Sequence, residues 1–199
     1  MNTRRPKHDP KESEREILDA AEAFLRERPF REMTVDAVMS RTGLKRPAFY
    51  AHFRDRHDLA LRVVEHVGLE LEAMVDRWLV GTDLKNDAQA AFAGLAEVYA
   101  QHGAVLRALS DAAGTDETVE GAYGDLIQRF INATAKRFTD DQAAGLIDAD
   151  LDVEETARAL VWMDERYLTQ AFSKEPFPET QRVVKVLFNI WYSALYGTD

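Results

Sequence analysis

Apolar residues recur at helical intervals along most of the chain. In the first such segment the apolar face comprises Ile17, Ala20, Ala21, Phe24 and Leu25. Pro29 is expected to end this amphipathic helix near Arg28. Ser13 and Glu16 have the spacing of a capping box, which predicts that the helix begins at Ser13. Alternation of apolar and polar residues is nowhere sustained, so the sequence predicts no strands.

Further helices follow this segment. Thr34 can cap a short helix that Gly43 interrupts, and a second short helix is expected over about 45–53. A long helix is predicted from Arg56 to about Val80. The remaining helices are predicted over about 84–101, 104–112, 116–138, 152–173 and 178–196. The chain is therefore predicted to be all-α, with about nine helices.

Charge divides the chain into two unlike parts. Residues 1–56 contain 13 Lys and Arg against 10 Asp and Glu, whereas residues 57–199 contain 12 against 25. Such a split indicates a basic module that meets a polyanion, attached to an acidic body. We predict a mobile polar tail over 1–12, a three-helix module with a helix-turn-helix over 13–56, and a second helical domain over 57–199.

The short helix over 45–53 has the features of a DNA-reading helix. Phe49 and Phe53 are expected to face the core, while Pro47, Ala48 and Ala51 make the opposite face slim enough to enter a major groove. The side chains that flank this slim face are Lys45, Arg46, Tyr50 and His52. Arg can pair with guanine through two hydrogen bonds, and Tyr, Lys and Thr commonly contact phosphates. A merely solvated basic face is the alternative.

The segment FREMTVDAVMSRTGLKRPAFYAHFRDRHDL, residues 30–59, resembles the DNA-binding region of the TetR family of transcriptional repressors. The shared features are Phe30, Thr34-Val35, Ala37, Thr42-Gly43, and FYAHF followed by Arg56 and Leu59. Residues 28–36, 159–172 and 190–197 are similar to one subfamily, the mycobacterial-type repressors of ethionamide activation. The resemblance is weakest between about 80 and 150.

This resemblance implies a homodimer that binds a palindromic operator in double-stranded DNA, and a small-molecule pocket in the C-terminal domain. By position, it implies phosphate contacts for Thr34, Thr42, Tyr50, His52 and Arg56. It also places Lys45 and Arg46 near base edges, with Pro47 on the DNA-facing side. The last two predicted helices would pair with those of the partner subunit in a four-helix interface. A largely apolar effector would then release the operator.

Two positions depart from the family pattern. Lys45 stands where Ser or Thr usually caps the recognition helix, and Ala48 stands where Thr is usual. Lys cannot accept a backbone N–H, so we expect a weakened first turn in the absence of DNA. Lys45 thus favours the alternative function, a dimeric helical protein that binds a small molecule without recognising a specific operator.

Asp164 is a candidate ligand-binding residue in the C-terminal domain. It falls on the apolar stripe of the helix predicted over 152–173, where a carboxylate is costly unless it is paired or protonated. An ion pair with Arg158 or Arg166, or exposure in a loose interface, is one interpretation, and a polar anchor in an apolar ligand site is the other. The resemblance implies further ligand-binding residues: Leu95, Tyr99, Phe130, Trp162 and Trp191. Asp164 would suit a ligand with a hydrogen-bond donor or a cation.

Other functions find little support in the sequence. It contains no HExxH, GxSxG, P-loop or GxGxxG motif, so we expect no enzyme, no metal site and no cofactor. There is no cysteine, no secretory signal and no apolar run of membrane-spanning length. These features predict a cytoplasmic protein that does not bind membranes. The operator sequence, the effector, and the choice between repression and activation are left open.

Overall fold

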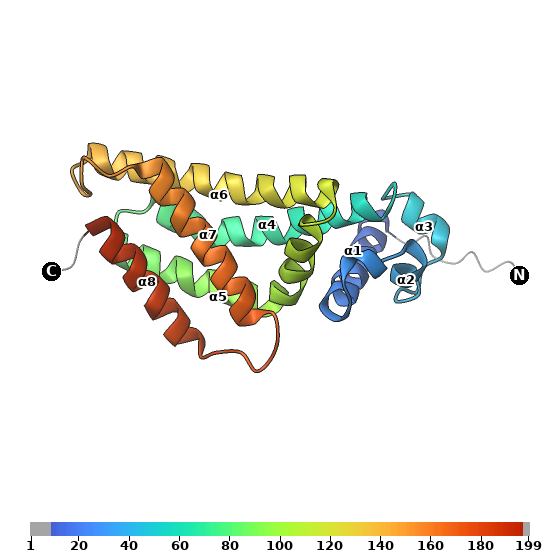
Figure 1. Ribbon diagram of the computed structural model, residues 1–199. Helices are drawn as coiled ribbons and strands as arrows, with labels where there is room; N and C mark the ends of the chain where they lie inside the picture. The colour runs from blue at the N-terminus through green and yellow to red at the C-terminus, as the bar shows by residue number, and fades with distance from the viewer. Residues whose placement is uncertain (1–8, 197–199) are drawn as a thin grey trace, which may run out of the picture.

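A computed structural model of the chain describes residues 9–196, and all its regular elements are helices (Figure 1). The N-terminal elements are α1 (Pro10–Glu27), the 3-10 helix η1 (Phe30–Glu32), α2 (Val35–Met39) and α3 (Arg46–Tyr50). They are followed by α4 (Arg56–Val80), α5 (Leu84–Ala113), α6 (Glu117–Ala143), α7 (Val153–Phe172) and α8 (Thr180–Tyr196). The all-α prediction is confirmed, with eight α-helices in the described part.

The helices form an N-terminal module, α1–α3, and a C-terminal body, α4–α8 (Figure 1). Phe49 and Phe53 are buried in the module, as the sequence predicted, and they hold α3 against α1 and α2. In the body α4 and α6 run side by side, and α7 crosses α5 and α6. None of the described helices combines the length and apolarity needed to cross a membrane.

The start of α1 differs from the prediction. The helix begins at Pro10, and the Asp9 side chain caps it by accepting a hydrogen bond from Lys11 N at 3.0 Å. An Asp cap followed by Pro at the first position is a strong helix start, so the predicted capping box is wrong. Glu16 instead accepts the Gly43 N–H at 2.6 Å and links α1 to the helix-turn-helix. Within the predicted tail, residues 1–8 lie outside the described residues.

The predicted break between residues 101 and 104 is also wrong, because α5 continues through Gly103. A Cβ atom at this glycine would lie 2.5 Å from the Phe172 carbonyl oxygen. Gly103 therefore allows the end of α7 to contact the backbone of α5. The glycine serves a close approach between helices and does not end one.

A partly buried polar cluster joins the N-terminal module to the C-terminal body. In this cluster, which we call the α1–α4–α5 junction, His102 Nδ1 on α5 lies 3.0 Å from Glu22 Oε2 on α1. Its other ring nitrogen lies 3.3 Å from Glu70 Oε2 on α4, and His66 Nδ1 lies 3.4 Å from Glu22 Oε1. A separate contact lies within the body, where His57 Nε2 at the start of α4 is 2.9 Å from the Asp116 carboxylate that caps α6.

The α1–α4–α5 junction shifts the pKa values of its two buried members, His102 and Glu22. The hydrogen bond to Glu22 raises the pKa of His102 against the opposing effect of burial, and the charges of Glu22 and Glu70 add to the increase. Burial alone would raise the pKa of Glu22, but His102, Arg26 and His66 together lower it. Both pKa shifts favour the charged forms, so the fold stabilises Glu22 and His102 as an ion pair.

The raised pKa of His102 sets a pH dependence of stability. The folded protein binds the His102 proton more tightly than the unfolded chain, so this contribution is complete below about pH 6.5 and is lost as pH rises through the folded pKa. We expect the melting temperature to fall by a few degrees over that range, and His102→Gln to remove this part of the decrease. His52→Gln, a substitution just after α3, serves as the control and should retain the full decrease in melting temperature. An unchanged pH profile in His102→Gln would contradict the assignment.

Candidate functional site

Two surfaces of the chain are candidates for function: the exposed face of α3 and a cavity in the C-terminal body. The helix-turn-helix that presents α3 is fixed by local hydrogen bonds. Thr34 Oγ1 accepts the Ala37 N–H at 3.1 Å and so caps α2. Thr42 Oγ1 donates to the Met39 carbonyl at 2.9 Å and accepts the Leu44 N–H at 3.2 Å. Thr34 therefore fixes the start of α2, and Thr42 shapes the turn between α2 and α3.

The exposed face of α3 contains four of the predicted DNA-binding residues: Lys45, Arg46, Pro47 and Tyr50. Arg46 donates to Asp36 Oδ1 at 2.7 Å and to the Tyr50 hydroxyl at 3.1 Å, and its guanidinium lies 5.8 Å from the Tyr50 ring centre. Asp36 on α2 was not predicted as part of this surface. It holds the Arg46 side chain in place and adds a negative charge beside it.

Lys45 precedes α3 without a side-chain capping hydrogen bond, as expected from its lack of an acceptor. His52 and Arg56 are only partly exposed. Arg56 donates to the carbonyls of Arg31 and Met33 at 3.4 and 3.3 Å. Its guanidinium also lies 5.1 Å from the centre of the Phe30 ring. Arg56 thus braces the η1 turn against the start of α4, a role that its position in the sequence did not reveal.

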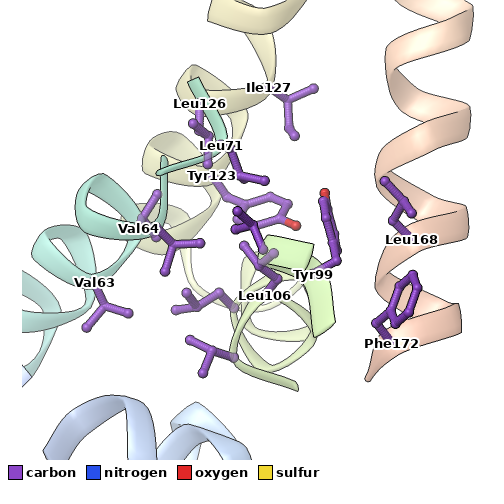
Figure 2. Packing of buried hydrophobic residues seen from close by; sticks show 14 of the residues in the cluster. Val63, Val64, Leu71, Tyr99, Leu106, Tyr123, Leu126, Ile127, Leu168 and Phe172 are labelled. Atoms are coloured by element: carbon purple, nitrogen blue, oxygen red, sulfur yellow. The ribbon is translucent and has the colours of Figure 1, made fainter. Parts of the chain in front are cut away.

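The cavity lies inside the C-terminal body and has a volume of about 100 Å³. All five helices of the body contribute to its wall, mostly with aliphatic and aromatic side chains. Figure 2 shows part of this region, with Tyr99 and Tyr123 among the apolar side chains of α4, α5 and α6 and with Leu168 facing them from α7. A narrow, mostly apolar cavity with a few polar groups is the usual form of a small-molecule site.

Asp164 is an acidic group of this wall with an unpaired buried oxygen among the described residues. It is 7% exposed, and its Oδ1 atom has no hydrogen-bond partner among the described residues. Burial raises the pKa of Asp164 to about 8, and the neighbouring Trp191 indole opposes this increase. Trp191 Nε1 is another buried polar atom of this wall without a hydrogen-bond partner among the described residues. The predicted ion pair with Arg158 is not formed, because that guanidinium contacts Glu155 at 3.2 Å.

The next residue, Glu165, is also buried in the wall, but it is satisfied by the protein. Its Oε1 atom accepts the Tyr123 hydroxyl at 2.7 Å and the Thr169 hydroxyl at 3.1 Å. Burial, with the nearby charges of Glu165 and Asp164, raises the pKa of the Tyr99 phenol far above its usual range. The sequence analysis missed this network, although Glu165 and Thr169 fall at i and i+4 on one helix face.

Five of the six predicted ligand-binding residues lie in the cavity wall: Leu95, Tyr99, Phe130, Asp164 and Trp191. Trp162 does not. Its side chain is 45% exposed and lies on the outside of α7, so its predicted position near the pocket is wrong. Trp78 on α4 was not predicted there and packs edge-to-face on Trp191, with ring centres 5.7 Å apart. An apolar helix stripe does not by itself distinguish a cavity wall from a solid core.

Known proteins are similar to this chain in both parts that carry the candidate surfaces, the helix-turn-helix and the C-terminal body. Residues 17–63 match the family described as bacterial regulatory proteins, tetR family, and residues 88–197 match the C-terminal domain of the transcriptional regulator EthR. The HTH-type transcriptional regulator EthR of Mycobacterium tuberculosis (strain H37Rv) is 30% identical over 99% of this chain and 92% of its own length. The chain belongs to the TetR family. EthR of Mycolicibacterium smegmatis is 27% identical over 98% of this chain and 90% of its own.

Solved structures of transcriptional regulators share the fold. A TetR-family regulator from Rhodococcus sp. superposes with a TM-score of 0.78 at 20% identity, covering 93% of this chain and 99% of that one. FadR from Bacillus subtilis, solved with stearoyl-CoA, has a TM-score of 0.76 at 14% identity, covering 93% and 99%. As in its TetR-family relatives, the helix-turn-helix is the DNA-binding part of a transcriptional regulator.

Asp36 gives this surface a testable property. Asp36→Asn keeps the size of the side chain but removes the negative charge and frees Arg46, so affinity for duplex DNA should rise severalfold at low salt. The change is measured by fluorescence anisotropy against one labelled duplex. Asp19→Asn, an exposed substitution on α1, is the control and should have a smaller effect. Weaker binding by Asp36→Asn would mean that the Asp36 contact prepares Arg46 for DNA.

Proposed function

We propose that the chain is a ligand-responsive repressor that binds a palindromic operator as a homodimer and leaves it when a small, largely apolar molecule fills the cavity. One observation carries this proposal. The same chain holds an exposed cationic recognition helix and an apolar cavity in whose wall the buried Asp164 Oδ1 and Trp191 Nε1 atoms have no hydrogen-bond partner among the described residues. The cytoplasm is the expected location, and no cofactor or catalysis is needed.

An exposed apolar surface on α7 and α8 supports dimerisation. Its large side chains are more than a third exposed, and they are Trp162, Tyr167, Val186, Ile190 and Tyr192. Large apolar patches on a soluble surface usually mark sites of association. The exposed Trp162 belongs to this set, which gives it a role at the proposed interface in place of the one predicted at the pocket.

The route from cavity to DNA is proposed to run through α4. This helix begins beside α3 at Arg56, and near its other end Trp78 lies in the cavity wall. Arg137 fixes that end by donating to the carbonyls of Trp78 and Gly81 at 2.6 and 2.9 Å. A ligand that favours one position of α4 changes the spacing of the two recognition helices in a dimer. By thermodynamic linkage, the ligand must lower the affinity for the operator by the same factor by which bound DNA lowers the affinity for the ligand.

The relatives support an apolar effector. The FadR structure of similar fold was solved in complex with stearoyl-CoA, a molecule with a long acyl chain. The cavity wall offers apolar contacts to such a chain from Leu71, Leu126, Ile127 and Leu168. A dimeric protein that binds a small molecule without reading a specific operator is the second candidate, and the uncapped start of α3 at Lys45 favours it.

Fluorescence anisotropy against the DNA upstream of the protein's own gene decides between these functions. The repressor should bind this duplex more tightly than a scrambled duplex at each salt concentration. Arg46→Ala should weaken specific binding by roughly tenfold or more, since it removes a potential base contact. Arg107→Ala, on the exposed side of α5, is the matched control and should bind as the wild type does.

Equal, weak and steeply salt-dependent binding to both duplexes would indicate phosphate attraction alone and would support the second candidate. Specific binding that Arg46→Ala leaves unchanged would contradict the role given to α3.

A further inference from the structure

The cavity wall contains two acids and no base. Among its 24 residues are Asp164 and Glu165, but there is no Lys, Arg or His. We propose that the molecule bound here is a cationic amphiphile, with a protonated amine beside Asp164 and an apolar body along the rest of the wall. This inference rests on the proposed function for its biological meaning, but its chemistry concerns the cavity alone.

The two acids differ in a way that points to Asp164. Glu165 is held by the hydroxyls of Tyr123 and Thr169, so the protein itself meets its need for partners. Asp164 is as deeply buried, yet Oδ1 has no partner. A buried carboxyl in a folded protein is normally paired or hydrogen-bonded. The missing partner of Asp164 is therefore expected in the ligand.

The arginine that is buried in the described part of the body cannot supply that partner. Arg137 on α6 is buried, but its guanidinium binds Asp141 at 3.0 Å and the carbonyls at the end of α4. On α7 itself, Arg158 is paired with Glu155 and Arg166 is exposed. The other titratable groups that line the cavity are Glu165 on α7 and four tyrosines, none of which can be a cation: Tyr99 on α5, Tyr123 on α6, and Tyr192 and Tyr196 on α8.

Aromatic rings beside Asp164 suit a cation as well. Trp191 is packed edge-to-face by Trp78 and Phe92, with ring centres 5.7 and 5.5 Å away. The faces of aromatic rings attract ammonium groups, most strongly when the site is dry. A carboxyl next to an indole thus offers charge and ring contacts to one ammonium group, while an anionic ligand would be repelled.

Proton linkage separates this ligand class from its main rival. Because burial raises the pKa of Asp164 to about 8, the carboxyl is mostly protonated at neutral pH without ligand. An amine cation binds the ionised form, so its binding releases a proton and strengthens as pH rises toward about 8. A neutral ligand whose carbonyl accepts the Asp164 proton would instead bind more weakly as pH rises.

The test is calorimetric titration of the full chain, without DNA, with decylamine, decan-1-ol and decanoate between about pH 6 and 8.5. At the upper end we expect decylamine to bind at least about tenfold more tightly than the alcohol, and decanoate to bind most weakly. The affinity for decylamine should rise by nearly tenfold per pH unit between about pH 6 and 7 and level off above about pH 8. Asp164→Asn, which keeps the side-chain shape, should abolish both the preference and the slope. Glu154→Gln, an exposed acid on the same helix, should keep both.

Three outcomes would overturn the inference: no binding of decylamine, equal binding of amine and alcohol, or affinity that falls with rising pH. The wild-type pH slope tests the idea even if Asp164→Asn folds poorly. Operator binding is followed in parallel by anisotropy. If decylamine binds through Asp164 but leaves operator affinity unchanged, release by ligand fails and the ligand class stands. If a neutral compound releases the operator while decylamine does not bind, release by ligand stands and the proposed ligand class fails.

Discussion

The ion pair between Glu22 and His102 fixes how the N-terminal module sits on the body. Glu22 is 4% exposed, so its charge is tolerable only while His102, His66 and Arg26 surround it. These groups come from α1, α4 and α5, and therefore the pair defines one orientation of three helices at once. A change in the position of α4 in the body is expected to reach α1 and, through it, the recognition helix.

The two buried acids of the cavity wall have the same need for partners, but only one of them meets it within the described protein. Glu165 has its partners within the chain, as Glu22 does, whereas Asp164 Oδ1 has none among residues 9–196. A protein selected only for stability would gain from an apolar residue at this position. An unpaired carboxyl that persists in an apolar wall is better explained by a bound molecule than by packing, and this contrast underlies the proposed ligand class.

Much of this architecture could be predicted because it depends on local pattern. The bounds of α4 follow from its apolar spacing, and the burial of Phe49 and Phe53 follows from their separation by one helical turn. The position of Asp164 on an apolar stripe was equally visible. The resemblance to the TetR family, carried by residues 30–59, supplied the arrangement of the two parts.

What could not be predicted depends on contacts between distant segments. Gly103 looked like a helix end because its close approach to Phe172 is invisible in the sequence. The ion pair of Arg46 with Asp36 was not predicted because Asp36 comes from the neighbouring helix. Trp162 was placed at the pocket by the family resemblance, which does not show that its side chain lies on the outer face of α7.

The distance between the two recognition helices of the proposed dimer tests the central claim most directly. Because the sequence has no cysteine, Arg54→Cys places one spin label per subunit next to α3, where the native side chain is exposed. Double electron–electron resonance should give a spacing compatible with adjacent half-sites, about 34–36 Å between their centres, on the operator. When tryptophan fluorescence shows that a ligand fills the cavity, we predict that the distribution of spin–spin distances shifts relative to that of the ligand-free protein. Identical distributions with the cavity empty and filled would contradict it.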